Sequence, residues 1–206
     1  ADALWGFPGL QNEVEDYGPR NGFETFDDMF TLAERRAWSR LHSGITTPIK
    51  SETTQKSPVM VVQPHQVGDS GRGNESYLHY ALKVFTVRWL IETKRNTFSS
   101  VTTETDTPIA EQTDKNLIPD IQVGNTVFEV ETLYGAGTPV LAIKETIEKY
   151  RRHNGVSDIR LILPPVAGFL HYNDLTQLAH EINETWNLEV SLSIPRLESR
   201  DIVSIE

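Results

Sequence analysis

The alternation of apolar and polar side chains is clearest in the second half of the chain. Residues 75–91 repeat apolar side chains at helical spacing, and Asn74 is suited to cap the first turn. Residues 98–103 are rich in β-branched side chains and predict a strand. Residues 118–123 and 126–132 predict two further strands. We therefore expect a helix followed by an antiparallel sheet.

Helices and strands alternate in the rest of this half. Residues 138–153 predict a helix, because Pro139 suits the first helical position and an apolar stripe follows it. Residues 159–163 form a short apolar run typical of a buried strand. Another helix from Asn173 and a strand over residues 188–194 precede a charged tail. The predicted order, α-β-β-β-α-β-α-β, indicates a mixed sheet flanked by helices.

The first part of the chain is less regular. Residues 26–41 carry apolar side chains at the spacing of an amphipathic helix, and the polar residues 43–57 predict a linker. Residues 59–62 are apolar, but their periodicity leaves helix and strand open. We divide the chain into an N-terminal helical extension over residues 1–57 and a domain over residues 58–206.

The predicted hairpin places acidic side chains together. A two-residue turn at Gly124-Asn125 sets Asp120 opposite Glu129, with Cβ atoms about 4.5–5.5 Å apart. Alternation along the strand puts Glu131 on the same side. The opposite side of the hairpin receives the apolar side chains Ile121, Val123, Phe128 and Val130. One side is therefore predicted to be core, and the other to carry three carboxylates.

Three carboxylates on one side of a hairpin require an explanation. Like charges placed opposite one another destabilise a sheet, so a cation must neutralise them, protons must be shared, or water must screen them. Oxygen ligands without nearby Cys or His suit Mg²⁺ or Mn²⁺ rather than zinc. The simpler alternative is the solvated face of an amphipathic hairpin.

Four further polar residues lie near these elements in the sequence. Glu75 is aligned with the apolar stripe of the predicted helix, where a carboxylate needs a partner such as a shared metal. It is equally explained as a first-turn acid favoured by the helix dipole. We expect His79 and Lys83 at a groove edge or in solvent. Glu104 follows the strand predicted at residues 98–103 and could reach the site, but its place in an acidic, Thr-rich loop is the simpler explanation.

Composition narrows the function. The 206 residues include no Cys, which excludes disulfides, thiol nucleophiles and cysteine-ligated zinc. The formal net charge of -10 argues against indiscriminate binding to nucleic acid, because phosphate contacts come from Lys and Arg. Positive side chains nevertheless gather in three segments: Arg35, Arg36 and Arg40; Lys94 and Arg95; and Lys144, Lys149, Arg151 and Arg152. Without a membrane span or signal peptide in the pattern, we expect a cytoplasmic protein with no membrane partner.

The order of these features resembles the PD-(D/E)XK nuclease superfamily, which includes restriction endonucleases and archaeal Holliday-junction resolvases. The likeness covers about residues 74–194: a helix with a glutamate, Pro119-Asp120 on a strand, Glu129-x-Glu131 on the next, and a basic helix. It implies an α/β fold with a restriction-endonuclease-like core, in which a mixed β-sheet is flanked by helices in αβββαβ order.

The resemblance also implies a metal site. By analogy Asp120 and Glu129 would ligate Mg²⁺ or Mn²⁺, and the Val130 carbonyl would add a further oxygen. Glu75 would complete or extend the site. The metal would lower the pKa of a bound water and stabilise the charge that develops on the phosphate.

One position departs from the family pattern. The usual lysine two residues after the acid is Glu131 here. By the resemblance, Glu131 or Lys144 at the start of the next helix would orient the attacking water. Taken by itself, Lys144 is explained more simply as a surface lysine.

The implied function is hydrolysis of DNA phosphodiester bonds by an endonuclease or a resolvase-like nuclease. A homodimer is a further expectation, because many relatives act as dimers. The alternative is a catalytically inactive module of the same fold that binds DNA or a protein, which Glu131 and the acidic net charge favour. A third hypothesis is a nuclease-like domain fused to another enzyme through residues 1–57.

Overall fold

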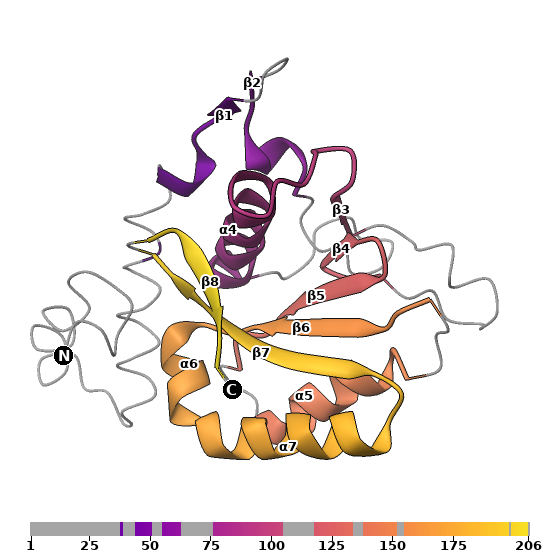
Figure 1. Ribbon diagram of the computed structural model, residues 1–206. Helices are drawn as coiled ribbons and strands as arrows, with labels where there is room; N and C mark the ends of the chain where they lie inside the picture. The colour runs from indigo at the N-terminus through magenta and orange to yellow at the C-terminus, as the bar shows by residue number, and fades with distance from the viewer. Residues whose placement is uncertain are drawn as a thin grey trace, which may run out of the picture.

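The computed structural model describes residues 38, 44–50, 55–62, 76–104, 118–133, 138–151, 155–197 and 199–205. Its elements are β1 (Ile49–Lys50), β2 (Gln55–Lys56), η1 (Pro58–Met60), α4 (Tyr77–Glu92), β3 (Thr102–Thr103), β4 (Ile121–Val123), β5 (Thr126–Val130), α5 (Pro139–Glu148), β6 (Asp158–Ile162), α6 (Pro165–Leu170), α7 (Tyr172–Thr185), β7 (Glu189–Arg196) and β8 (Asp201–Ser204). Figure 1 shows a layered α/β fold, with α4 on one face of the main sheet and α5 and α7 on the other.

The main sheet is mixed and has the strand order β3-β4-β5-β6-β7-β8. The strands β3, β4 and β5 pair antiparallel, β5, β6 and β7 pair parallel, and β8 returns antiparallel to β7. From α4 to β6 the elements follow the predicted order α-β-β-β-α-β. The prediction of a mixed sheet flanked by helices is confirmed.

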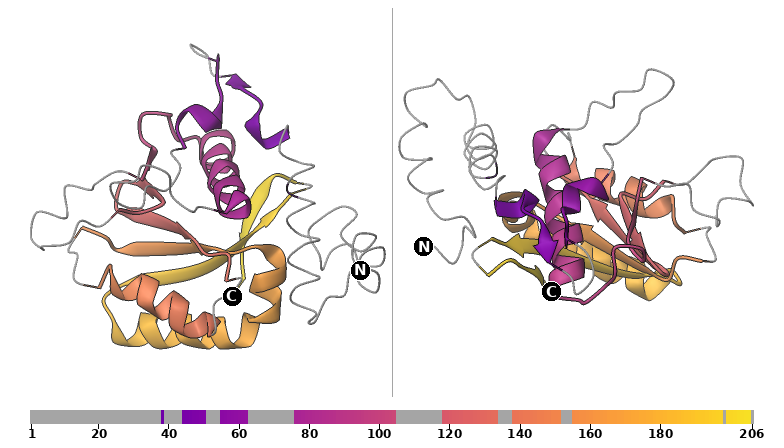
Figure 2. Two further views of the ribbon diagram at one scale, coloured as in Figure 1. Left: turned by 180° about the vertical axis from the view of Figure 1, so that it is seen from behind. Right: turned by 90° about the horizontal axis from the view of Figure 1, so that it is seen from above.

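The hairpin of β4 and β5 has the predicted turn. Gly124 has a φ of 59°, a left-handed conformation that glycine adopts readily. Ile121 pairs with Phe128 as predicted, and both side chains are buried in the core that α4 covers. The opposite side is also covered, since Val127 is buried in the core of α5 and α7. Figure 2 shows these two helices beneath the sheet from behind.

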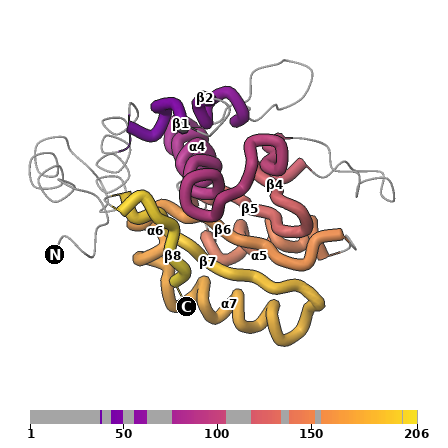
Figure 3. Tube along the Cα trace, turned by 45° about the horizontal axis from the view of Figure 1, so that its top comes forward, coloured from indigo at the N-terminus to yellow at the C-terminus, as the bar shows by residue number. Residues whose placement is uncertain are grey.

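Helix α4 is buried on nearly all sides rather than along one stripe. Every side chain of residues 81–91 is buried. The segment with β1 and β2 lies across α4 from the sheet (Figure 3). Trp38 and Ile45, from the predicted N-terminal extension, belong to the same core as the helix. Arg88 ties this segment to α4, because its Nη1 donates to the Thr47 carbonyl at 2.9 Å.

The start of α4 differs from the prediction. The cap is Ser76, whose hydroxyl accepts the backbone N–H of His79 at 3.1 Å, and the helix begins at Tyr77. The prediction of Asn74 as the cap was therefore wrong. Asn74 and Glu75 lie outside the described residues.

Four segments show what the local pattern missed. Residues 98–100 form a turn, because Ser100 bonds back to Thr97, so β3 is all that remains of the strand predicted there. In the apolar run at residues 59–62, Val59 and Met60 lie in η1 and the last two residues follow it. The predicted charged tail contains β8, which pairs with β7. Directly after Pro164 the chain forms α6, since proline suits a first helical turn.

Two further expectations concern segments that the structure describes only in part. The helix predicted at residues 26–41 lies outside them except for Trp38. Within them, no helix combines the length and the apolar character that crossing a membrane requires.

Candidate active site

The predicted acidic side chains meet at the carboxyl end of β5. Asp120 directly precedes β4, Glu129 lies within β5, and Glu131 directly follows it. The pairing of β4 with β5 ends at Ile121 and Phe128, and Asp120 lies in a bend beyond this pair. Its carboxylate turns toward β5, where Oδ2 accepts the backbone N–H of Val130 at 2.8 Å. The structure therefore brings Asp120 to the end of β5 through its side chain.

Asp120 is held among positive and hydrogen-bonding groups. It is 6% exposed, its Oδ2 lies 3.2 Å from Nε2 of His79, and its Oδ1 lies 4.0 Å from Nζ of Lys83. Burial raises the pKa of Asp120, but His79, the Val130 N–H and Lys83 outweigh it and hold this pKa below its ordinary value of 3.8. Asp120 is therefore the ionised member of the site.

Lys83 and Glu104 belong to the site as well. The Lys83 side chain is fully buried, and its Nζ donates to Oε1 of Glu104 at 2.7 Å. Glu104 has a φ of 46°, and its backbone N–H donates to the carbonyls of Pro119 and Asp120. This strained turn directs the glutamate side chain inward. The expectations of a groove-edge or solvated Lys83 and of a Glu104 outside the site were wrong, because both side chains are buried, bonded to each other and next to Asp120.

Burial raises the pKa of the Glu104 carboxyl, which Lys83 partly offsets and the nearby charge of Asp120 reinforces. A buried ammonium next to two carboxyl groups is compensated, whereas removal of one partner would leave a buried charge. Lys83 therefore has two effects, since it neutralises Glu104 and also acts on Asp120.

Glu129 has the opposite character to Asp120. It is 8% exposed, and its Oε1 accepts the hydroxyl of Tyr150. Burial raises the pKa of Glu129 well above its ordinary value of 4.5, and the charges of Asp120 and Glu131 add to the effect, while Lys149 opposes it. The environment therefore favours a neutral Glu129 beside an ionised Asp120. Neighbouring carboxyl groups with pKa values driven apart are typical of acid–base and metal sites.

Glu131 faces the helix that follows the hairpin. Its Oε1 accepts the hydroxyl of Thr146 at 2.6 Å. Burial raises the pKa of Glu131, Thr146 opposes the shift, and the charge of Asp120 reinforces it. Thr146 lies in α5, and Tyr150 follows one helical turn later, just beyond the end of this helix. The sequence placed Tyr150 on an apolar stripe, and its need for a hydroxyl partner was the available signal.

Lys144 does not reach this group. It lies two residues before Thr146, which is about 200° around an α-helix. Within the described residues it makes no hydrogen bond or ion pair, and the lysine whose charge acts on Glu129 and Glu131 is Lys149. The lysine that the fold brings to Asp120 is Lys83.

The donor set offers the predicted metal few free ligand atoms. In the described part of the chain, no three His, Asp or Glu side chains are arranged to hold a metal ion. One oxygen of Glu129 and one of Glu131 are engaged by hydroxyls of α5 and its last turn, and Oδ2 of Asp120 is engaged by Val130. The Val130 carbonyl stays a predicted ligand, and Glu75 lies outside the described residues. The arrangement fits an ion with few protein ligands rather than a closed cage.

Comparisons of the chain with models of known families, with curated proteins and with solved structures found no match.

Proposed function

We propose that this protein is a metal-dependent nuclease that hydrolyses DNA phosphodiester bonds at the carboxyl end of β5. The observation that carries the proposal is the burial of Glu129 beside the ionised Asp120, with the ammonium of Lys83 4.0 Å from Oδ1 of Asp120. Burial is the main cause of the raised pKa of Glu129, and a divalent cation would relieve the repulsion from Asp120 that adds to it. The α-β-β-β-α-β order from α4 to β6 supports a restriction-endonuclease-like core.

The donor set suits Mg²⁺ or Mn²⁺. Mg²⁺ usually keeps several waters and binds through one or two carboxylates together with substrate phosphates. Asp120 and Glu129 would supply the carboxylates and Val130 a carbonyl oxygen, with Glu75 as a further candidate. The metal would supply Lewis-acid stabilisation of the phosphate and a more acidic water. Binding requires loss of the Glu129 proton, so affinity should increase with pH.

Side chains of the protein itself supply the remaining functions of the site. Against the effect of burial, His79, the Val130 N–H and Lys83 together hold the pKa of Asp120 down, and Lys83 supplies positive charge in a site from which water is largely excluded. Thr146 holds one oxygen of Glu131 and leaves the other available to orient a water. We assign the cation role to Lys83 rather than Lys144, because only Lys83 approaches Asp120.

The test is cleavage of supercoiled plasmid with Mg²⁺, with Mn²⁺ and with excess EDTA. Nicking or linearisation should require the metal, and D120N, E129Q and K83M should each reduce its rate about 100-fold or more. K56M, which removes an exposed lysine, is the matched control and should cleave at the native rate. Thermal unfolding of each variant checks that it has folded.

Two results would change the assignment. If E129Q cleaved plasmid at the native rate, the carboxylate site would have no part in the mechanism. Loss of cleavage in K144M, with native activity in K83M, would transfer the cation role to Lys144.

A catalytically inactive module that binds DNA or a protein is the second candidate. One observation favours it: Tyr150 and Thr146 already satisfy an oxygen of Glu129 and of Glu131 without a metal. This candidate predicts that the folded native protein leaves plasmid intact with either metal, while a gel-shift or pull-down assay detects binding.

A further inference from the structure

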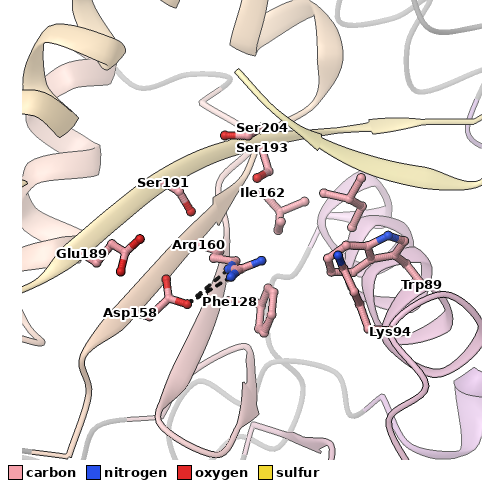
Figure 4. A pocket seen from close by; sticks show the side chains of 11 residues that line it. Trp89, Lys94, Phe128, Asp158, Arg160, Ile162, Glu189, Ser191, Ser193 and Ser204 are labelled. Carbon is pink, nitrogen blue, oxygen red and sulfur yellow. Dashed lines mark hydrogen bonds and ion pairs between the residues drawn. The ribbon is translucent and has the colours of Figure 1, made fainter. Parts of the chain in front are cut away.

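A second, independent feature is a cavity of about 260 Å³ beside the end of α4. It lies on the face of the sheet that α4 covers, where the floor is formed by β6, β7 and β8 (Figure 4). We call it the β6–β8 groove and define it by Trp89, Lys94, Arg160, Ser191, Ser193 and Ile202. None of its lining residues belongs to the carboxylate site.

Two cations border this groove, and each is held over an aromatic ring. The guanidinium carbon of Arg160 lies 5.8 Å from the centre of the Phe128 ring, and Nζ of Lys94 lies 4.9 Å from that of Trp89. Figure 4 shows Arg160 pointing from the floor toward the side where Trp89 and Lys94 lie. Because the cations come from different elements, their convergence depends on the fold.

The donors of Arg160 are only partly used. Its Nε and Nη2 each lie 3.3 Å from Oδ2 of Asp158, which orients the guanidinium and leaves Nη1 directed away from this carboxylate. Lys94 has no carboxylate partner among the described residues. Arg160 and Lys94 therefore offer two positive groups to an anion, and an oriented arginine is well suited to phosphate.

Hydroxyl groups lie next to the cations. Ser191 is paired with Arg160 across β7 and β6, and Ser193 is paired with Ile162. Ser193 is 6% exposed and lines the groove, and its backbone carbonyl accepts the N–H of Leu163 at 2.9 Å. The side chains of Ser191 and Ser193 lie on the same side of the sheet as Arg160, so both hydroxyls are placed to bond a ligand in the groove.

Apolar side chains line the end of the groove where Lys94 lies. Trp89, Ile162 and Ile202 line it, and the Trp89 indole is fixed by a 2.7 Å hydrogen bond from Nε1 to Asp201. A fixed aromatic surface next to two cations suits a flat ring that is joined to an anion. The combination of phosphate-binding cations, hydroxyls and an aromatic wall is the chemistry of a nucleotide.

We propose that the β6–β8 groove binds a nucleoside monophosphate unit. The phosphate lies between Lys94 and Arg160, the sugar faces Ser191 and Ser193, and the base lies against Trp89. The unit comes either from a free nucleotide or from one nucleotide of a strand. This binding is additional to the proposed cleavage and needs no metal.

The test is calorimetric titration of the full chain in EDTA with AMP, adenosine, inorganic phosphate and a short single-stranded oligodeoxynucleotide. AMP should bind more tightly than adenosine or phosphate, since only AMP carries both the phosphate for the cations and the base for Trp89. R160Q and K94Q should each weaken AMP binding at least about tenfold, and S193A should weaken it several-fold. EDTA prevents metal-dependent cleavage, so the result is independent of the proposed nuclease.

R151Q is the matched control, because Arg151 also lies over a tryptophan, Trp186, but in the layer of α5 and α7. It should bind AMP as the native chain does. An affinity for AMP no higher than for phosphate, or native affinity in both R160Q and K94Q, would overturn the proposal. Binding of the oligonucleotide at least about tenfold more tightly than AMP identifies a strand as the source; equal or weaker binding identifies the free nucleotide.

Discussion

Asp120 and Glu129 show how two neighbouring carboxyl groups acquire different charge states. The Asp120 carboxylate accepts the Val130 N–H and lies near His79 and Lys83, whereas Glu129 accepts only the Tyr150 hydroxyl among its described partners. Burial alone would raise both pKa values, so the difference arises from the positive and N–H groups that α4 and β5 direct at Asp120.

These pKa shifts predict the pH dependence of stability in EDTA. The pKa of Glu129 in the folded protein is above 4.5. Its contribution to the free energy of unfolding is therefore fully present below pH 4.5 and is lost as pH rises through the pKa of the folded protein. Glu104 and Glu131 act in the same direction. Asp120 acts oppositely, because its pKa in the folded protein is below 3.8. The stabilisation that Asp120 contributes is lost as pH falls through this folded-state pKa.

Urea unfolding of the native chain and E129Q, from pH 4.5 to pH 8, checks this prediction. E129Q should gain stability relative to the native chain as pH rises, because glutamine keeps the acceptor for Tyr150 without a charge. A constant difference between the two proteins across this range would contradict the assignment of a raised pKa to Glu129.

At the scale of elements, close packing of helices on the sheet determines where the site and the groove lie. Helix α4 is buried between the sheet and the segment with β1 and β2, so its polar side chains Lys83 and Arg88 must find partners inside the protein. Helix α6 contacts β7 through Gly168, and a Cβ built there would lie 2.8 Å from Cγ2 of Ile194.

G168A should therefore destabilise the protein by about 1–3 kcal/mol, because the added methyl group overpacks the contact between α6 and β7. Chemical denaturation measures the change. G44A is the matched control, since a Cβ at Gly44 would meet nothing within 4 Å, and it should change the free energy of unfolding by less than about 0.5 kcal/mol. Equal effects of the two substitutions would show that α6 adjusts freely.

At the scale of the whole molecule, the two proposed sites lie on one framework and differ in charge. The carboxylate site collects acidic groups from β3, β4 and β5 and their ends, whereas the β6–β8 groove offers Lys94 and Arg160. The lining of the groove also contains Asp158 and Glu189, so carboxylates balance its cations, in a chain whose formal net charge is -10.

If the carboxylate site binds a divalent cation, the whole protein should become more stable with it. Mg²⁺ at 100 times its Kd should add about 2.7 kcal/mol to the free energy of unfolding, because the ion binds only the folded chain. Differential scanning calorimetry at pH 8 with Mg²⁺ and with EDTA measures the difference. The double variant D120N/E129Q is the control, and a stabilisation of the same size in it would place the ion elsewhere.

Local patterns predicted a substantial part of the fold and part of the candidate site. The Gly124 turn and the alternation around it predicted the pairing of Ile121 with Phe128, because hairpin register depends on residues close in sequence. The pattern overstated the strand at residues 98–103 and missed β8, since short strands form only where a neighbouring strand offers its edge.

The sequence by itself determined the mixed α/β sheet and the approach of Asp120 to the strand that carries Glu129, because both follow from short-range periodicity and one tight turn. Only the tertiary structure decided that Lys83, Glu104 and Tyr150 join these acids, since each comes from a separate segment brought in by packing. It likewise formed the β6–β8 groove from the end of α4 and three strands. Side-chain burial and long-range electrostatics depend on that packing, which periodicity along the chain does not encode.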